Sequence, residues 1–446
     1  MLITKIHRKK TGITLRIRRK GRRLSHTSMQ TVRYAKRQMK IPMVHDGQGD
    51  FIELRQKERR LLRCPLIRLQ GKVDSDDVWS LGPAIGIYAL RHRAKGALFG
   101  PQTKMFVTLI QLGRKLGADI FVIPAGHLGH DHSEVLAYRY LRSSGWRLMR
   151  CPWPDFVWRR MTERPVTLVS ILDDEEKLLA KATIQGVLPR SCCDKWTIHT
   201  LLTNEDGIPD YVPDTILVTE FDQFLPAIAS FGDVYIKPVR GTQGMKIARI
   251  IQQDGGYLYR DHESQQSFEW ITNDRELLQR WGQQLSPQQG FLVQKTVQLM
   301  MTRFNDPFDL RYLIQAVPAK PAVCTATIAR LANSHALTTN LHTGSRAVTV
   351  DTVIGLLHPE DTKRFVKGVQ TGEMIALLAF QIVQKKYPSL VELGVDIALD
   401  SLGRPFLLEV NPVPGRKMLR LLDSRLRRLS LLRVLEYAVW STGFRA

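Results

Sequence analysis

Two stretches near the C-terminal end, GVDIALD (residues 394–400) and LLEVNPVPG (residues 407–415), decide the expected fold. The Ser-Leu-Gly-Arg turn between them predicts that they form an antiparallel hairpin. Glu409 and Asn411 leave the same face of their strand because they are two positions apart, and Asp396 can face them across the hairpin. Two carboxylates and an amide oxygen are ligands that Mg²⁺ binds while it keeps phosphate oxygens and waters. Since the neighbouring residues are apolar, we predict a magnesium site rather than a set of exposed acids.

A second motif, VYIKPVRGTQGMKIARI (residues 234–250), places Lys237 at the end of a predicted strand. A loop with Gly241 and Gly244 follows, and the run from Ile247 predicts a second strand, so we expect a hairpin. Glycines let backbone N–H groups approach phosphate oxygens, and the lysine adds a point charge. The loop lacks the Walker A pattern, and an ordinary hairpin is the alternative interpretation of this motif alone.

Several further residues are candidates for contacts with a nucleotide. Lys195, in the sequence CDKW, is a candidate phosphate ligand, although a lone lysine is commonly a surface side chain. Gln294, Lys295 and Val297 lie in a predicted strand whose backbone could read the edge of an adenine ring. Two arginines in later strands suit the stabilisation of phosphoryl or oxyanion charge, and structural ion pairs are the equally favoured alternative. These arginines are Arg311 and Arg330, and a polar loop after them contains Asn340.

The length and composition restrict the class of protein. A chain of 446 residues suggests two to four domains, at roughly 100–200 residues per domain. With 43% hydrophobic and 24% charged residues, the chain is expected to fold rather than to remain disordered. No uninterrupted apolar run approaches the roughly 20 residues of a membrane-spanning helix, and the N-terminus lacks the apolar region of a secretory signal. The five cysteines show neither a disulfide framework nor a metal-binding spacing, so we expect a cytoplasmic protein.

Positive charge is concentrated at the N-terminus. The net charge is +23, and residues 1–70 carry 20 Lys and Arg against four acidic residues. Within this segment Ile13, Leu15 and Ile17 alternate with polar or basic neighbours, which predicts a half-buried strand. One interpretation is an electrostatic surface for nucleic acid or another polyanion. The other is the solvated face of a small β module, which we favour because no aromatic residues interleave the basic cluster.

The middle of the chain shows alternating strand and helix patterns, which predict an α/β region with a parallel sheet. The predicted elements are a strand that leads into a Gly-containing loop within 78–90, a helix at 100–117, a strand at 118–126, a helix at 132–146 and a strand at 146–160 that Pro152 and Pro154 interrupt. Farther along, strands are predicted at 233–239, 291–297, 309–317, 324–332, 391–400 and 403–415, with a helix at 364–387. Leucines at helical spacing predict a last helix over 419–440 that docks on its own domain, with membrane-surface binding as the alternative.

The ordered set of motifs resembles the ATP-grasp superfamily. In chain order these motifs are DKW, IKP with its glycine loop, VQK, DLR, ARL, TNLHTG, GVD and LLEVNPVPG. The second half looks like the peptide-ligase branch, and the whole is similar to the YheC/YheD family, described as endospore coat-associated proteins of spore-forming bacteria. The resemblance extends upstream through LGPAIGI (residues 81–87) and WPDFVWRR (residues 153–160), so it covers roughly residues 78–446.

The resemblance implies an ATP-grasp fold in which two α+β subdomains clasp ATP, behind a Rossmann-like pre-ATP-grasp α/β domain and the basic N-terminal module. The implied bounds are 1–76 for the module, 77–190 for the pre-ATP-grasp domain and 191–446 for the ATP-grasp domain. The implied ATP ligands are Lys195, Lys237, Gly241, Gly244, Gln294, Lys295 and Val297. The implied Mg²⁺ ligands are Asp396, Glu409 and Asn411, and the implied catalytic residues near the γ-phosphate and acceptor are Arg330 and Asn340.

Two functions follow from these expectations. The favoured one is an ATP- and Mg²⁺-dependent ligase that joins a carboxylate to an amine or thiol through an acyl-phosphate, with an unidentified substrate. The alternative is a nucleotide-binding, non-catalytic assembly protein of the spore coat, whose basic residues 1–40 dock on a polyanionic or coat partner. The departures from the family pattern near Lys246 and at Ser345, where glycines are usual, favour the alternative. Nucleic acid is not expected as the main partner, because only net charge supports it.

Overall fold

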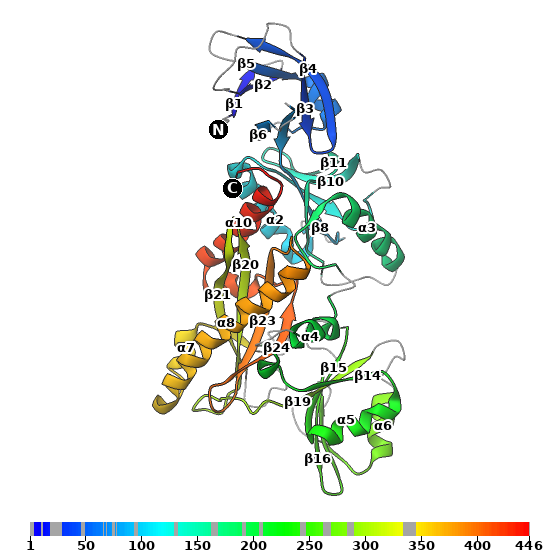
Figure 1. The fold of residues 1–446 in the computed structure, drawn as a ribbon, viewed down its shortest axis with the longest axis vertical. Coiled ribbons are helices and arrows are strands. Elements are labelled where there is room, and N and C mark those ends of the chain that lie inside the picture. Colours follow the sequence, from blue (N-terminus) through cyan, green and yellow to red (C-terminus); the bar gives the residue numbers. More distant parts are fainter. Residues whose placement is uncertain are drawn as a thin grey trace.

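The computed structural model describes most of the chain as four β-sheets arranged along one long axis, with helices on their faces (Figure 1). The described residues are 4–9, 12–17, 29–45, 50–65, 67, 69–73, 76, 78–92, 97–128, 133–161, 168–189, 193–204, 208–240, 247–261, 269–282, 290–332 and 345–445. Gly241, Gly244 and Asn340, which the sequence analysis selected as site residues, lie outside the described residues.

The first sheet contains the basic N-terminal segment. Its strands lie in the order β1-β2-β5-β4-β3-β7-β6. They are β1 (Thr4–Lys9), β2 (Gly12–Ile17), β3 (Met29–Tyr34), β4 (Arg37–His45), β5 (Asp50–Arg55), β6 (Gln70–Val73) and β7 (Trp79–Gly82), and helix α1 (Gln56–Leu62) follows β5. The strand predicted around residues 13–17 is therefore confirmed. The strand expected at the start of 78–90 is confirmed as β7, but the Gly-containing loop expected after it is wrong. The chain leaves the first sheet at Pro83, which has no N–H for pairing, and residues 84–89 form a strand of the second sheet.

The second sheet has the strand order β11-β10-β9-β8-β12-β13. Strands β8 (Ala84–Ala89), β9 (Asp119–Pro124), β12 (Phe156–Arg159) and β13 (Ile184–Gln185) are parallel, as the alternating pattern predicted. The predicted helix at 100–117 is present as α2 (Thr103–Leu116), and α3 (Val169–Ala182) follows β12.

The helix predicted at 132–146 is wrong. Residues there form β10 (Glu134–Leu141), which pairs antiparallel with β11 (Gly145–Pro152) and also contacts β9. Gly145, with φ +68°, ends the turn between the two strands. Buried Val135 and Ala137 alternate with exposed Leu136, the period of a strand with one covered face. Pairing across the sheet thus outweighed the weak helical spacing of the apolar residues.

The third sheet is antiparallel throughout, with the order β14-β19-β15-β16-β17-β18. Its strands are β14 (Thr215–Val218), β15 (Asp233–Pro238), β16 (Ala248–Gln253), β17 (Gly256–Asp261), β18 (Glu269–Ile271) and β19 (Phe291–Lys295), with helices α5 (Phe224–Phe231) and α6 (Asp274–Gly282). The predicted hairpin after Lys237 is confirmed, because β15 and β16 pair directly.

The fourth sheet carries the two stretches that decided the expected fold. Its order is β22-β21-β20-β23-β24, from strands β20 (Phe308–Val317), β21 (Lys320–Leu331), β22 (Arg346–Val348), β23 (Glu392–Leu399) and β24 (Pro405–Asn411). Helix α7 (Val350–Ile354) leads to the long helix α8 (Thr362–Lys386), which packs on this sheet. The strands and helix predicted for this region are confirmed.

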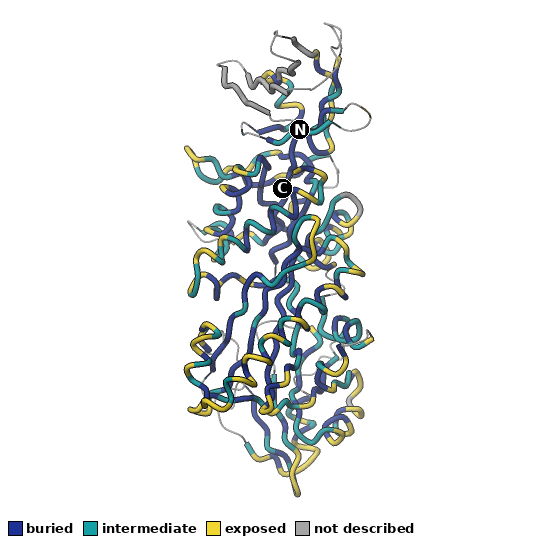
Figure 2. Tube along the Cα trace, turned by 60° about the vertical axis from the view of Figure 1, so that its left-hand side comes forward, coloured by how far each residue is buried: buried dark blue, intermediate teal, exposed yellow. Residues whose placement is uncertain are grey.

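One hydrophobic core joins the second and fourth sheets. Trp158 of β12, Leu310 of β20 and Phe380 of α8 belong to it, together with Ile198 of α4 (Lys195–Thr203). The third sheet has a separate core, which includes Val234, Ile236, Ile250, Tyr259 and Trp281. Buried positions accordingly run through the middle of the sheets and exposed positions cover the outside (Figure 2). The second and fourth sheets therefore form one packed block, next to a third sheet with its own core.

The C-terminal segment forms two helices instead of the single predicted one, α9 (Lys417–Leu422) and α10 (Ser424–Ser441). The break falls at Asp423, whose carboxylate accepts hydrogen bonds from the backbone of Arg425 and Leu426 at 2.7 and 3.0 Å. Docking on the chain's own sheets is confirmed. The buried face differs from the predicted leucine stripe and consists mainly of Leu431, Val434, Leu435, Ala438 and Val439.

Within the described part of the chain, one helix, Pro359–Lys386, is long and apolar enough to cross a membrane by length and composition. The core helix of a globular protein passes the same test. Here the helix buries Phe365, Ile375 and Phe380 in the core that it shares with the fourth sheet.

Candidate nucleotide and metal site

A cleft lies between the third sheet on one side and α4 with β24 on the other. Apolar side chains form most of the wall, and the polar side chains are Lys195, His199, Lys237, Gln294 and Glu409. Such a cleft, apolar with a few convergent polar groups, is typical of a small-molecule site.

Lys237 projects from β15 into this cleft. Its Nζ donates to Gln294 Oε1 at 2.7 Å, and Gln294 Nε2 donates to Thr215 Oγ1 at 3.1 Å. Burial lowers the pKa of Lys237 to about 8, an effect that the nearby carboxylate of Glu409 opposes and the ammonium of Lys195 reinforces. The Lys237 ammonium is therefore an incompletely compensated cation, which a bound anion would stabilise.

Lys195 reaches the same cleft from the first turn of α4. Asp194 caps this helix by accepting the Thr197 N–H at 2.8 Å, and the Lys195 N–H donates to Val239 O at 3.1 Å. Lys195 Nζ lies 3.7 Å from Glu409 Oε1 on β24. The structure thus brings two lysines and one of the predicted metal ligands together, from three elements far apart in the sequence.

The three predicted metal ligands share one face of the β23–β24 hairpin. Asp396 is directly opposite Glu409 in the strand register, and Asn411 is opposite Gly394. The side chain of Glu409 is 42% exposed and open to the cleft, whereas that of Asp396 is only 4% exposed. Asn411 Oδ1 accepts a hydrogen bond from the Val413 N–H at 2.9 Å.

Asp396 is held by two arginines from neighbouring strands. Arg311 Nη2 donates to one carboxylate oxygen at 2.6 Å, and Arg311 Nε donates to the other. Arg330 Nη2 lies 2.9 Å from Asp396 Oδ2, and Arg330 Nε donates to Asp309 Oδ1 at 2.7 Å. Burial alone would raise the pKa of Asp396, but the two guanidiniums lower it below the ordinary value. Both arginines are therefore in buried ion pairs, the alternative that the sequence left open.

The donor set nevertheless suits a divalent cation. Asp396 and Glu409 are register partners, Asn411 is on the same face of the hairpin, and each side-chain oxygen set has lone pairs beyond those already bonded. In the described residues, no group of three or more His, Cys, Asp and Glu side chains forms an alternative metal site. A cation bound here would share Asp396 with the arginines, and Glu409 would be its most accessible ligand.

The predicted adenine-contacting residues are not all placed in the cleft. Gln294 lines it, but Lys295 is exposed on the other face of β19, with its Nζ 3.5 Å from Asp214 Oδ2. Lys295 N–H also donates to Asp214 O at 2.9 Å. Val297 is half-buried and, like Lys295, is not one of the residues that line the described cleft.

Sequence reasoning missed His199, which lines the cleft one helical turn beyond Lys195. Its ring stacks on Trp196 with centroids 5.2 Å apart and planes 17° apart, and burial lowers its pKa. Ile198 and Leu202 line the cleft beside it. Ile198, His199 and Leu202 follow Lys195 by three, four and seven positions, so they lie on the same helix face as the lysine. This helical spacing is the signal that would have predicted them.

Comparison with known families identifies what the chain is similar to. The family model described as "YheC/D like ATP-grasp" matches residues 186–440. Endospore coat-associated protein YheD of Bacillus subtilis (strain 168) is 23% identical over 347 residues, which are 77% of this chain and 75% of that protein. Endospore coat-associated protein YheC of the same organism is 23% identical over 284 residues, 62% of this chain and 74% of that protein. A solved structure of D-alanyl-alanine synthetase A from Vibrio cholerae O1 is 13% identical, covers 79% of this chain and 98% of its own, and has a TM-score of 0.43.

Proposed function

The chain belongs to the YheC/D-like ATP-grasp family, and on this basis we propose that it is an ATP- and Mg²⁺-dependent ligase joining a carboxylate to an amine or thiol. The observation that carries the proposal is the meeting of Lys195, Lys237 and Glu409 in one cleft. Two cations beside an accessible carboxylate suit a triphosphate with its divalent ion, because both ligand charges find opposite charges nearby.

In this proposal each side of the cleft has its own role. The ammonium groups of Lys195 and Lys237 bind phosphate oxygens, and the loop with Gly241 and Gly244 covers them. Gln294, which lines the cleft, contacts the adenine from the segment that also carries Lys295 and Val297. Asp396, Glu409 and Asn411 hold Mg²⁺, which when bound neutralises phosphate charge. Arg330 and Asn340 stand near the γ-phosphate and the acceptor.

The proposed reaction has two steps. A substrate carboxylate oxygen attacks the γ-phosphorus of ATP, the bond to the β-phosphate oxygen breaks, and ADP leaves. An amine or thiol then attacks the acyl carbon, and inorganic phosphate leaves as the nucleophile gives up its proton. The chain's own residues contribute by binding and orienting charge, as phosphoryl transfer requires, and none of them has to become a covalent nucleophile.

Acceptor-stimulated ADP release in the presence of Mg²⁺ tests the proposal. The full chain is assayed against a panel of amino acids, dicarboxylates and peptides, alongside Glu409→Gln. Release that rises with one acceptor class and is lost in Glu409→Gln supports the ligase. Equal release by both proteins would contradict the assigned role of Glu409.

A second candidate function is a nucleotide-binding assembly protein of the spore coat, as the names of the relatives suggest. The observation favouring it is the double ion pair of Asp396, whose carboxylate is already neutralised by Arg311 and Arg330. In this case the protein is cytoplasmic and associates with the spore coat, and residues 1–40 dock on a polyanionic partner. Tight ATP binding without turnover across the whole panel supports this function, and salt-sensitive partner binding that disappears when residues 1–40 are deleted identifies the docking segment.

A further inference from the structure

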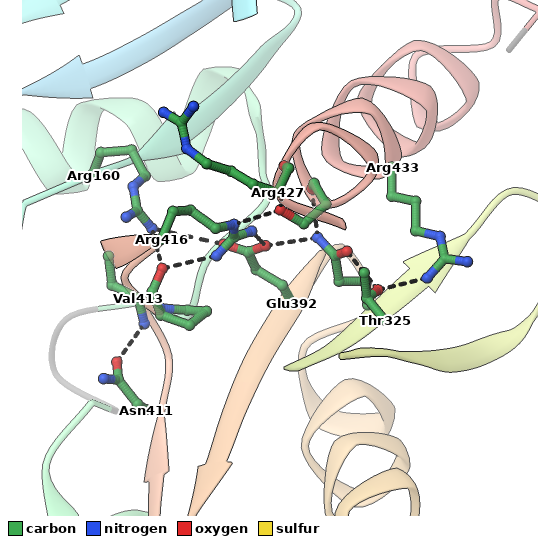
Figure 3. Close-up of polar contacts among 11 residues, drawn as sticks. Arg160, Thr325, Glu392, Asn411, Val413, Arg416, Arg427 and Arg433 are labelled. Carbon is green, nitrogen blue, oxygen red and sulfur yellow. Dashed lines mark hydrogen bonds and ion pairs between the residues drawn. The ribbon is translucent and has the colours of Figure 1, made fainter. Parts of the chain in front are cut away.

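A buried polar network joins the second sheet to the loop that follows Asn411 (Figure 3). At its centre is Glu392, the first residue of β23, which is only 1% exposed. Arg416 and Arg160, each 5% exposed, approach it from the fourth-sheet loop and from the end of β12. The network thus connects the second and fourth sheets.

Both arginines bind the same backbone carbonyl. Arg416 Nη1 donates to Pro414 O at 2.9 Å, and Arg160 Nη1 donates to it at 3.2 Å. Arg416 also donates to Ser430 Oγ at 2.9 Å and is ion-paired with Glu392, while Arg160 Nη1 lies 3.7 Å from Glu392 Oε1. Pro414 is consequently fixed from the fourth sheet and from the second sheet at once.

Pro414 lies three residues beyond Asn411, and the intervening loop is tightly held. The Val413 N–H donates to Asn411 Oδ1 at 2.9 Å, so the position of the loop backbone orients the Asn411 amide. Gly394 is opposite Asn411 in the register and packs closely against Pro414. A Cβ added at Gly394 would lie only 3.0 Å from Pro414 Cβ. A shift of Pro414 would therefore move Asn411, since the loop has little room to absorb it.

Stability alone does not account for this network. Two buried guanidiniums share one carboxylate, and in the described part of the chain Arg160 Nε and Glu392 Oε1 have no hydrogen-bond partner. Burial lowers the pKa of Arg160 to about 10 in spite of Glu392. Buried, incompletely satisfied charges are commonly less stabilising than apolar residues of the same volume. Arg160 therefore imposes a desolvation cost that a purely structural role would avoid.

We propose that Arg160 is a positioning residue: by holding Pro414 it orients Asn411 for the divalent cation, and so makes the cation site depend on the docking of the second sheet. This inference rests on the proposed function, because it assumes that Asn411 is a metal ligand. Groups that orient metal ligands from the second layer are typically worth about 10–100-fold in metal affinity.

The test compares Arg160→Met with a matched control, Arg159→Met. Arg159 is the preceding residue and is similarly buried, but its guanidinium binds Glu176, Leu188 O and Cys193 Sγ and does not contact Pro414 or Glu392 in the described network. Arg160→Met leaves Glu392 paired with Arg416, so it is expected to fold with an unchanged or higher melting temperature. Arg416→Lys, which keeps a buried cation but cannot reach Pro414 O, Ser430 and Glu392 together, is a second test variant.

The readout is the affinity of the full-length protein for a fluorescent ADP analogue, measured with Mn²⁺ and with EDTA. We expect Arg160→Met and Arg416→Lys to lower the Mn²⁺-dependent gain in affinity about tenfold or more, with the affinity in EDTA unchanged. Arg159→Met should keep the full gain. An unchanged gain in Arg160→Met, or an equal loss in Arg159→Met, overturns the positioning role.

A Glu409→Gln sample separates this inference from the proposed function. If Glu409→Gln loses the Mn²⁺ gain and Arg160→Met keeps it, only the positioning role is wrong. If Glu409→Gln itself keeps the Mn²⁺-dependent gain in affinity, the proposed cation site is wrong, and the positioning role of Arg160 is wrong as well.

Discussion

Asp396 and Glu409 are directly opposite in the β23–β24 hairpin, but their carboxylates have different environments. Asp396 is buried between Arg311 and Arg330, while Glu409 faces the cleft within 3.7 Å of the Lys195 ammonium. The pair therefore joins a buried charge cluster to an accessible site. The buried member fixes the strand geometry, and the accessible member is the one that a ligand can reach.

Lys237→Met is expected to weaken nucleotide binding about tenfold or more. A hydrogen bond to a charged group is typically worth about 1.5–3 kcal/mol, and 1.4 kcal/mol is a factor of ten in affinity. The measurement is titration with a fluorescent ADP analogue, with Lys320→Met, an exposed lysine of β21, as the control. Equal affinities of wild type and Lys237→Met would contradict a phosphate contact.

The pKa of Lys237 also predicts a pH dependence of stability. Because it is lowered from 10.5 to about 8 in the folded protein, the unfolded chain binds more protons between these two pH values. The free energy of unfolding of the wild type, relative to Lys237→Met, should therefore rise as the pH increases from about 8 to 10.5. Urea unfolding of both proteins at several pH values checks the sign, and a falling difference would contradict it.

Nucleotide binding should show the opposite trend in the same range. Anionic phosphate favours the protonated amine, so the affinity of the wild type for ADP should fall as the pH rises above about 8. In Lys237→Met, the affinity for ADP should fall much less over the same pH range. Parallel pH profiles for the two proteins would assign the titration to another group.

Arg330→Met is expected to lower the free energy of unfolding by about 3–5 kcal/mol, because it removes a buried guanidinium bonded to both Asp309 and Asp396. Urea unfolding measures the loss. Arg404→Met is the control, since Arg404 is 67% exposed in its ion pair with Asp400 and should cost about 1 kcal/mol or less. Similar losses for the two variants would contradict a buried cluster.

Asp423→Ala tests the break between α9 and α10. Loss of a capping carboxylate typically costs about 1 kcal/mol, so the melting temperature should fall by a few degrees. Asp361→Ala is the control, because Asp361 precedes α8 without a side-chain capping bond, and its ion pair with half-exposed Arg364 is expected to contribute about 1 kcal/mol or less. A variant of Asp423 as stable as the wild type would show that packing alone sets the break.

Local sequence patterns predicted much of the fold. The hairpins of β15–β16 and β23–β24 were predictable because turn residues and the two-residue period act over a few positions. The helix wrongly predicted at 132–146 is strand β10, which pairs along its whole length with β11 and also contacts β9. The contact with β9 and the ion pair of Arg139 with buried Asp119 at 2.5 Å involve a distant part of the chain, and such contacts leave no mark in a local spacing.

The sequence by itself determined the face that Asp396, Glu409 and Asn411 share, together with the placement of Lys237 at the end of its strand. Both follow from strand alternation within short segments. Only the tertiary structure decided that Asp396 meets Arg311, 85 residues away, and that Glu409 meets Lys195 across a cleft. It also brought Arg160 and Arg416 to one carbonyl. These contacts depend on the packing of separate sheets, because side chains so far apart in the chain become neighbours only when the sheets pack together.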